Sequence, residues 1–508
     1  MALDSDIRTL SNGERVPLAD VPQFGLAKFR AWLQAEVLDG SQLSALFGVP
    51  QGATRLALYA VTSKATNGRI AVASTIAPDR YPSLTPHVPQ AHWFEREIAE
   101  QWGVVPEGHP WLKPIRFHPS YANGRDAWGR SVGEPILPGV TDYFRVEGDD
   151  IHEVAVGPVH AGVIEPGHFR FQCHGEHVFT LEIELGYQHR GIERKLVGGP
   201  TKRTLHYMET LAGDTTIAHA TAYAHAVEGL SSVSPPLRAQ AIRAIGLELE
   251  RLANHVGDLG ALAQDVGFLP TASYCGRLRG DFLNATAMIC GNRFGRGTVR
   301  PGGVGFDLDD LLAQAIGDKV EVALRDVDGA ARLLWNSSTV MARFEETGAI
   351  SHVTASELGL VGPAARASGI DRDVRRDFPA GYYRFAQLPV STWHSGDVFA
   401  RAYLRWLEVE RSARFVLEQL HTLPQTTVCT EMSSLAPNSL VVTLVEGWRG
   451  EICHVALTDE DGQFAHYKVV DPSFHNWIGL AMALRDQQIS DFPLCNKSFN
   501  LSYCGHDL

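Results

Sequence analysis

The sequence predicts an α+β fold, with a small N-terminal α/β domain followed by a large, mainly helical bundle domain that carries a peripheral β-sheet. Apolar residues recur with a helical period along three long segments of the second half of the chain. Short strand-like runs lie before and after these segments. The length of 508 residues corresponds to about three average domains. Together these observations favour a multidomain globular protein.

The first domain is assigned to residues 1–118. A helical pattern at 25–46 is followed by strand-like runs at 54–62 and 69–75. Proline-rich turns and a short helix at 92–102 complete it. This order of elements is typical of a small sheet covered by helices.

A linker is predicted at 119–150, where Gly, Pro, Asp and Ser are frequent. The large domain, 151–508, begins with strands up to about residue 185 and continues with long helices, of which the clearest are 237–264, 307–335 and 396–423. Ser234 is the expected cap of the first of these helices. The end of the chain, 441–508, is expected to be strand-rich at first and then loop-like.

Charge and cysteine content exclude several functions. The chain has 45 Lys and Arg against 58 Asp and Glu, a net charge of −13, which argues against a general nucleic-acid binder. Its seven cysteines include no CxxC pair, which excludes a zinc ribbon and a self-contained ferredoxin-type cluster. Scattered cysteines indicate a reducing compartment. Because there is neither an export signal nor an apolar run of about 20 residues, we expect a soluble chain at the cytoplasmic side of the membrane, held there by partners.

The first candidate cluster lies at 156–171, where turn-forming Gly and Pro residues surround His160, Glu165 and His168. By spacing alone, a structural hairpin with incidental histidines is the more frequent explanation. The second cluster, at 181–196, is a dense patch of mixed charge, and its usual explanation is a solvated, salt-bridged face.

A third cluster places Asp214 ahead of a helix, where it or Thr215 could simply be the N-cap. An Arg/Gly-rich loop at 290–304 lacks both the GxGxxG order and a Walker pattern, so nucleotide binding is weakly supported. For this loop, for the charged stretch 362–377 and for the tail 492–508, an ordinary surface loop is at least as good an explanation.

The order of these motifs is more informative than any one of them. VGPVHAGVIEPGHFRF through LEIELGYQHRGIERKL, the helix from residue 217, CGNRFGRGTVRPGGV and ARASGIDRDVRRD occur in sequence. Together they resemble the large subunits of membrane-bound, energy-converting (group 4) [NiFe] hydrogenases and the related quinone-site subunit of respiratory complex I. Residues 82–110 resemble the small accessory subunit of complex I, which is often fused ahead of the large subunit.

The resemblance implies a metal site that this sequence lacks. Hydrogenases of this kind hold nickel and iron with four thiolates from two CxxC motifs, and soft thiolates suit that pair of metals. The matching positions here are Ala212, Thr215, Ser502 and Gly505. Cys504 lies one residue away from a matching position. The resemblance therefore implies a hydrogenase-like scaffold with no metal and no cofactor bound by this chain.

The resemblance to complex I implies a quinone site. In complex I, a His on the loop that matches residues 156–171 and a Tyr near the segment that matches 212–215 bind the quinone headgroup. In this sequence His168, or else His160, falls on the matching loop, but no Tyr occurs at 209–217. Asp214 is the available substitute, so the catalytic candidates are His160, His168 and Asp214. Candidates for a proton path or for coupling are Glu165, Glu184, His189, Arg190, Glu193, Arg366 and Asp371.

Three functions remain open at this point. The chain would be the large subunit of a membrane-associated oxidoreductase that passes electrons from a small iron–sulfur subunit to a quinone-like acceptor, coupled to ion translocation. Its further partners would be a ferredoxin-like subunit and antiporter-like and other integral membrane subunits, with no nucleic acid. Alternatively it is a non-catalytic structural or coupling subunit. A minor alternative is a formate-hydrogenlyase-type hydrogenase subunit with unusual ligands.

Overall fold

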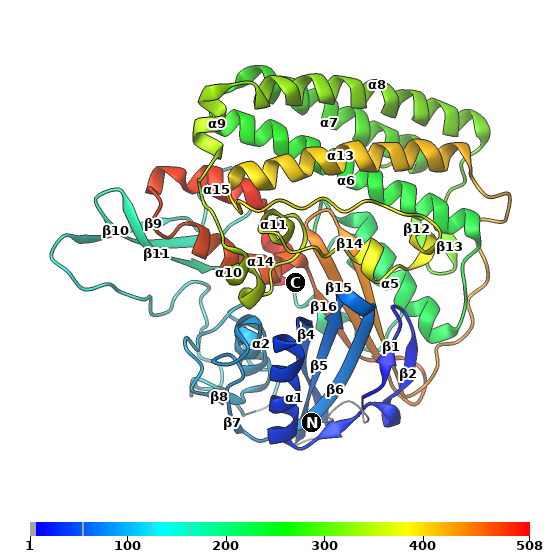
Figure 1. The fold of residues 1–508 in the computed structure, drawn as a ribbon. Helices are drawn as coiled ribbons and strands as arrows, with labels where there is room; N and C mark the ends of the chain where they lie inside the picture. The colour runs from blue at the N-terminus through cyan, green and yellow to red at the C-terminus, as the bar shows by residue number, and fades with distance from the viewer. Residues whose placement is uncertain (1–6, 53–54, 123, 163) are drawn as a thin grey trace.

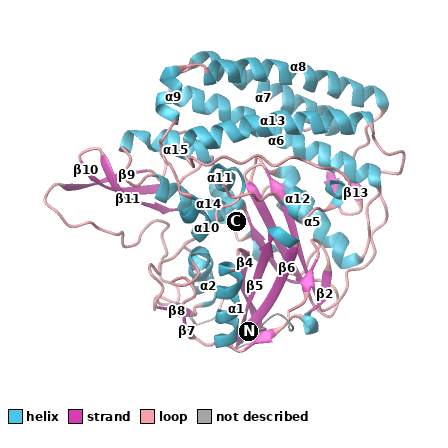
Figure 2. Cartoon of the chain, viewed as in Figure 1, coloured by secondary structure: helices cyan, strands magenta, loops and turns pink. Residues whose placement is uncertain are grey.

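The computed structural model describes residues 7–52, 55–122, 124–162 and 164–508. Long helices stack side by side across one end of the molecule, and the N-terminal sheet and its helices lie at the other end (Figure 1). Between them runs a second sheet, and a three-stranded arm projects from one side (Figure 2). The predicted α+β class is confirmed.

The N-terminal sheet has the strand order β1-β6-β5-β4, with β3 added in parallel to β6. The expected strands at 54–62 and 69–75 and the helix at 92–102 are confirmed. The helix expected at 25–46 is wrong in its last part, because the chain turns at Gly40, with a φ of +83°, and enters a strand. The elements of this region are β1 (Thr9–Leu10), β3 (Gln23–Phe24), α1 (Leu26–Leu38), β4 (Gln42–Gln51), β5 (Arg55–Lys64), β6 (Arg69–Ala77), β7 (Arg80–Pro82), α2 (His92–Trp102) and β8 (Val105–Glu107).

Four long helices form the bundle: α6 (Leu237–Asp265), α7 (Leu269–Cys290), α8 (Asp310–Trp335) and α13 (Val398–His421). The three predicted helices are confirmed, and α7 is an addition. The expected cap Ser234 is wrong: the N-cap of α6 is Pro236, and Ser234 lies two residues before it, too far to reach the first free N–H groups.

The second sheet has the order β16-β15-β14-β2, so a strand from the start of the chain joins the sheet of the large region. All residues of β14 and β15 are buried, and α5 packs against both strands. The boundaries predicted for the domains, 1–118 and 151–508, stay a prediction. The elements are β2 (Arg15–Pro17), α5 (Thr216–Ser231), β14 (Ser439–Gly447), β15 (Gly450–Thr458) and β16 (Phe464–Val470).

The end of the chain is helical, which corrects the expectation of a loop-like tail. The three helices α14 (Pro472–Ala483), α15 (Phe492–Phe499) and α16 (Tyr503–Asp507) are largely buried. The projecting arm consists of β9 (Ile151–Val156), β10 (His168–His174) and β11 (His177–Glu184), as the strand pattern predicted.

Short elements connect these layers. They are α3 (Ile192–Leu196), α4 (Thr204–Met208), β12 (Val299–Arg300), β13 (Gly303–Val304), α9 (Ser338–Phe344), α10 (His352–Leu358), α11 (Gly362–Ala367) and α12 (Val374–Asp377). The last two lie in the stretch expected to be a surface loop, yet most of their residues are buried. Within the described ranges, no helix is both long and apolar enough to cross a membrane.

Candidate functional site

The two segments that the resemblance assigns to metal binding lie side by side. One precedes α5 and the other enters α16, and they carry the matched positions Ala212, Thr215, Ser502 and Gly505. Arg190 joins them, because its guanidinium donates to the carbonyl oxygen of Leu211 at 2.9 Å and to that of Cys504 at 3.3 Å. We call the space enclosed by the four matched positions the cleft.

An ion pair occupies the cleft. Arg449, in the turn between β14 and β15, donates to the two carboxylate oxygens of Asp214 at 2.6 and 2.8 Å. The same guanidinium lies 3.3 Å from the hydroxyl of Thr215 and donates to the carbonyl of Asn500. Burial would raise the pKa of Asp214, but Arg449 holds it below its ordinary value. The Asp214 side chain remains 32% exposed, so solvent reaches this end of the cleft.

Asp471 closes the cleft on the side of α16. It caps α14 by accepting from the backbone N–H of Ser473 at 2.8 Å, and it hydrogen-bonds His219 Nε2 at 3.0 Å. A Cβ atom at Gly505 would lie 2.7 Å from the Asp471 carboxylate carbon, closer than such atoms approach. A cysteine at this position would therefore require Asp471 to move, so the residues present do not fit a four-thiolate nickel–iron centre.

A chain of hydrogen bonds continues from Asp471 into the core. His219 Nδ1 lies 3.1 Å from His454 Nε2, and His454 Nδ1 lies 2.9 Å from the hydroxyl of Tyr467. All four residues are fully buried. Burial lowers the pKa of His454 well below its ordinary value, so this imidazole is neutral. A chain of buried, ionisable side chains therefore extends from the cleft into the core.

Glu250, on α6, lies beneath the start of α5. It accepts from the backbone N–H groups of Ile217 and Ala218 at 2.7 and 3.3 Å. Burial, reinforced by the charge of Asp214, raises the pKa of Glu250 to about 8. The cavity that Glu250 and Asp214 line holds only about 10 Å³, roughly enough for one water molecule. This cavity beside the cleft is therefore too small to hold a cofactor or a substrate.

Two of the predicted site residues meet at Tyr503, the first residue of α16. His160 Nε2 lies 3.4 Å from the Tyr503 hydroxyl, and Glu165 accepts from its backbone N–H at 3.2 Å. His168 begins β10, accepts from Arg170 at 3.2 Å and packs near the ring of Tyr143. The structure therefore brings His160 and Glu165 to the segment of Ser502 and leaves His168 on the arm.

Three further candidates, Glu184, Glu193 and His189, are held in contacts with other segments of the chain. Glu184 pairs with Lys113 at 2.5 Å, and Glu193 pairs with Lys468 at 2.9 Å. His189 hydrogen-bonds the backbone of α16 at 2.9 Å, and burial lowers its pKa to about 4. The mixed-charge pattern indicated a solvated, salt-bridged face. The ion pairs of Glu184 and Glu193 are present, but their side chains are largely buried.

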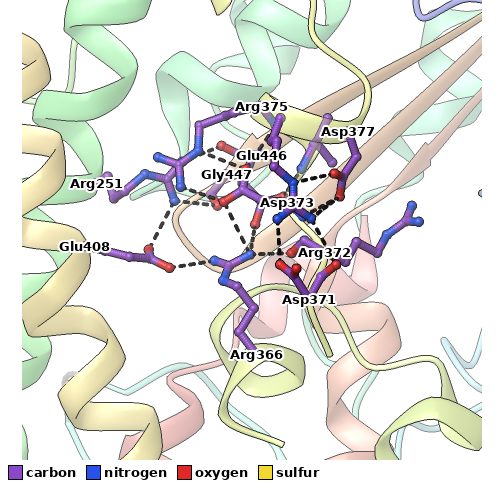
Figure 3. Close-up of polar contacts among 12 residues, drawn as sticks. Arg251, Arg366, Asp371, Arg372, Asp373, Arg375, Asp377, Glu408, Glu446 and Gly447 are labelled. Atoms are coloured by element: carbon purple, nitrogen blue, oxygen red, sulfur yellow. Dashed lines mark hydrogen bonds and ion pairs between the residues drawn. The ribbon is translucent and has the colours of Figure 1, made fainter. Parts of the chain in front are cut away.

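A buried charge network surrounds Arg366 on α11 (Figure 3). Its guanidinium donates to Glu446 at 2.8 Å and to Glu408 at 2.7 Å, and it lies 3.6 Å from Asp373. Burial opposes the charge of Arg366, but the three carboxylates more than compensate and raise its pKa. The network joins α11 to α13 and β14.

Two more arginines extend this network, as Figure 3 shows. Arg251 donates to the carbonyl oxygens of Glu446 and Gly447 at 2.6 and 3.0 Å, and Arg375 binds Asp373 at 2.6 Å. The candidate Asp371, in contrast, lies at the surface, where its partner is the exposed Arg376. We call the set Arg251, Arg366, Asp373, Arg375, Glu408 and Glu446 the Arg366 network.

Sequence reasoning missed Arg449, Asp471 and Glu250. Arg449 follows a Trp in a hairpin turn, far along the chain from Asp214, and no local spacing relates the two. Asp471 precedes a Pro at the start of a helix, a pattern that indicates a cap but not a site. Glu250 lies among other buried charged residues on α6, and what distinguishes it is that it accepts from backbone N–H groups and forms no ion pair in the described residues.

Side chains that could bind a metal are numerous but do not cluster in the described residues. In the ranges that the structure covers, no three His, Cys, Asp or Glu side chains are grouped so that they could hold a metal ion. The thiol of Cys504 lies beside Ser502, and burial, together with the charge of Glu165, raises its pKa to about 12. A thiol with this pKa is protonated at neutral pH and is a poor metal ligand.

Fold and site define a class of protein: a two-part α+β subunit in which the segment before α5 and the C-terminal helix enclose an ion-paired cleft. Two family patterns match the sequence. The respiratory-chain NADH dehydrogenase 49 Kd subunit family matches residues 265–439, and the corresponding 30 Kd subunit family matches residues 21–127.

Curated relatives cover most of the chain. Formate hydrogenlyase subunit 5 of Escherichia coli is 30% identical over 91% of this chain and 84% of its own length. Hydrogenase-4 component G of the same organism is 29% identical, with 83% and 75% covered. An NADH-quinone oxidoreductase subunit from Solibacter usitatus is 28% identical, with 66% and 91% covered. The chain therefore belongs to the family of complex I 49 Kd-like and energy-converting hydrogenase large subunits, with a 30 Kd-like region fused ahead, and the resemblance is confirmed.

Proposed function

We propose that this chain is the large subunit of a membrane-associated, complex-I-like oxidoreductase that passes electrons from an iron–sulfur partner to a quinone-like acceptor without a nickel–iron centre. The observation that carries the proposal is the cleft itself. Its four matched positions offer no thiolate, and the Arg449–Asp214 pair spans the space between them. The names of the relatives add formate hydrogenlyase and NADH-quinone oxidoreductase as the reactions of this scaffold.

The chemistry of the cleft suits an acceptor that takes up protons with electrons. A guanidinium is a strong donor to a carbonyl oxygen, so Arg449 would bind the headgroup. Asp214 is exposed enough to exchange protons with solvent, and the buried Asp471–His219 pair lies behind it. Because Asp214 is the member of the ion pair that solvent reaches, the acceptor would lie at the solvent-exposed end of the cleft, where a partner subunit completes the site.

A set of exposed basic side chains, which we call the basic rim, would receive that partner. In the segment around Arg190, which contacts both sides of the cleft, and in the loop that packs on Glu209, eight side chains are exposed and, in the described part of the chain, form no ion pair: Arg190, Arg194, Lys195, Lys202, Arg203, Arg293, Arg296 and Arg300. The chain as a whole carries a net charge of −13. A local excess of positive charge on an acidic protein favours an acidic partner, and we assign the rim to the small iron–sulfur subunit. The ferredoxin-like and membrane subunits would attach through it or elsewhere.

The test is electron transfer in the assembled complex. We expect R449M and D214N to lower the rate of reduction of a soluble ubiquinone analogue by at least about tenfold while assembly is retained, and D371N to leave the rate unchanged. Equal rates in all variants would contradict the proposal, as would nickel at one equivalent per complex.

A further inference from the structure

A pocket of about 310 Å³ lies between α2, the loop that follows it, β11 and α14. It is built where the N-terminal region meets the large region and shares no lining residue with the cleft. Ligand sites occur preferentially at such junctions, and the volume lies at the lower end of the range for small-molecule pockets. The inference below concerns this pocket and does not depend on the proposed function.

Aromatic side chains dominate the wall. Trp93 comes from α2, Trp111 from the following loop, Phe144 from the 119–150 segment and Trp477 from α14. The rings of Trp111 and Phe144 meet edge to face with centroids 6.4 Å apart. Flat rings contributed by four separate segments favour a planar aromatic guest, because stacked and edge-to-face contacts add to the gain from burial.

The charges that line the pocket are mostly positive. The buried guanidinium of Arg96 lies 4.7 Å from the ring of Trp93, but it is already paired with Glu184 at 3.9 Å and donates to two backbone carbonyl oxygens. The single carboxylate of the lining, Glu182, is likewise bound by Lys113 and by the indole N–H of Trp111, each at 2.5 Å. Arg485, in contrast, is exposed and makes no ion pair in the described residues, so an anionic group on the guest would balance its charge.

One buried donor of the wall has no partner. Trp93 is 8% exposed, and its indole N–H makes no hydrogen bond in the described structure. The ring nitrogen Nδ1 of the neighbouring His92 is likewise unpaired, and burial lowers the pKa of His92 well below its ordinary value, so this side chain is neutral. An unpaired buried donor destabilises a folded protein, and an acceptor on a guest would remove that cost.

We propose that this pocket binds a planar aromatic carboxylate, with its ring between the tryptophans and its acid group toward Arg485. Two of the tryptophans that would contact the bound ring also contact a segment that borders the cleft. Trp477 donates to the carbonyl of Ser502 at 3.4 Å, and Trp93 meets the ring of His506 edge to face at 5.5 Å. Both contacts end on the segment of α16, which forms one side of the cleft.

The first test is a titration of the full chain with 2-naphthoate, followed by tryptophan fluorescence and by calorimetry. We expect saturable binding of one equivalent. R485Q should weaken binding of 2-naphthoate about tenfold, because a charge-assisted contact is lost, and should leave binding of the neutral 2-naphthamide unchanged. No saturable binding, or equal weakening of both probes, would overturn the proposal.

The second test blocks the pocket. Ala481 lines the pocket from α14, so A481F should abolish binding of 2-naphthoate while the circular dichroism spectrum is retained. D371N, which changes an exposed side chain outside the pocket lining, should bind as the wild type does. Retained binding in A481F would place the probe elsewhere and overturn the assignment. Because R485Q alters only an exposed side chain, its result stands even if A481F does not fold.

Discussion

The cleft and the Arg366 network are both built from arginines and carboxylates, but they differ in their exposure to solvent. In the network, Arg366 has no exposed surface and contacts three carboxylates. In the cleft, Arg449 contacts one carboxylate that is 32% exposed. The network therefore fixes helices to a sheet, whereas the cleft keeps an ionisable group within reach of solvent. Similar residue types thus serve packing in one place and chemistry in the other.

The largest effect is expected from breaking the network. R366M leaves Glu408, Glu446 and Asp373 without their shared cation, and we expect the free energy of unfolding to fall by about 3–5 kcal/mol, the usual cost of an uncompensated buried charge. Chemical denaturation measures it. The control R332M removes an exposed pair on α8 and should change stability by less than about 0.5 kcal/mol. A loss in R366M no larger than in R332M would remove the contrast.

A smaller loss is expected in the cleft. R449M should lower the free energy of unfolding by about 1–3 kcal/mol, because water can reach the remaining Asp214 carboxylate. The pKa of Asp214 should rise toward or above its ordinary value, and carboxyl NMR shifts would follow it. R449K, which keeps the charge but not the two-pronged geometry, should retain part of the stability. A loss as large as that of R366M would show that the cleft is closed to solvent.

The pH dependence of stability should report Glu250. Its pKa is about 8 in the folded protein against an ordinary value of 4.5, so between these values the folded state binds more protons than the unfolded state. The contribution of Glu250 to stability must then fall as the pH rises from about 4.5 to 8. E250Q should flatten this part of the curve in denaturation experiments at several pH values. An unchanged slope would mean that Glu250 titrates normally.

The smallest effect is expected at the surface. D371N removes a carboxylate from the same charged stretch that carries Arg366, but Asp371 contacts only the exposed Arg376. We expect a change in stability below about 0.5 kcal/mol. Thermal unfolding compared with R366M would show whether burial, rather than charge content, distinguishes the two positions.

The sequence predicted the elements that carry a regular apolar pattern and missed those that do not. The helices α6, α8 and α13 have an apolar stripe, and β5 and β6 are short, mostly apolar runs. The helices α14 to α16 are buried on most sides. Their sequences therefore lack the alternation of an apolar and a polar face by which a surface helix is recognised. The stretch 362–377 is rich in charge, which indicates a surface until its partners on α13 and β14 are known. The cleft was located through the resemblance, whereas its filling by Arg449 and Asp471 depends on contacts between distant segments.

The position of Asp471 beside Gly505 also bears on how this protein could evolve. A glycine-to-cysteine change at 505 would place its first side-chain carbon within 2.9 Å of both Asp471 oxygens, so it would be harmful before it could be useful. Four cysteines alone would not rebuild a metal site, because the arginine and the aspartate would also have to be replaced. Single substitutions at these positions therefore cannot restore a metal site one step at a time.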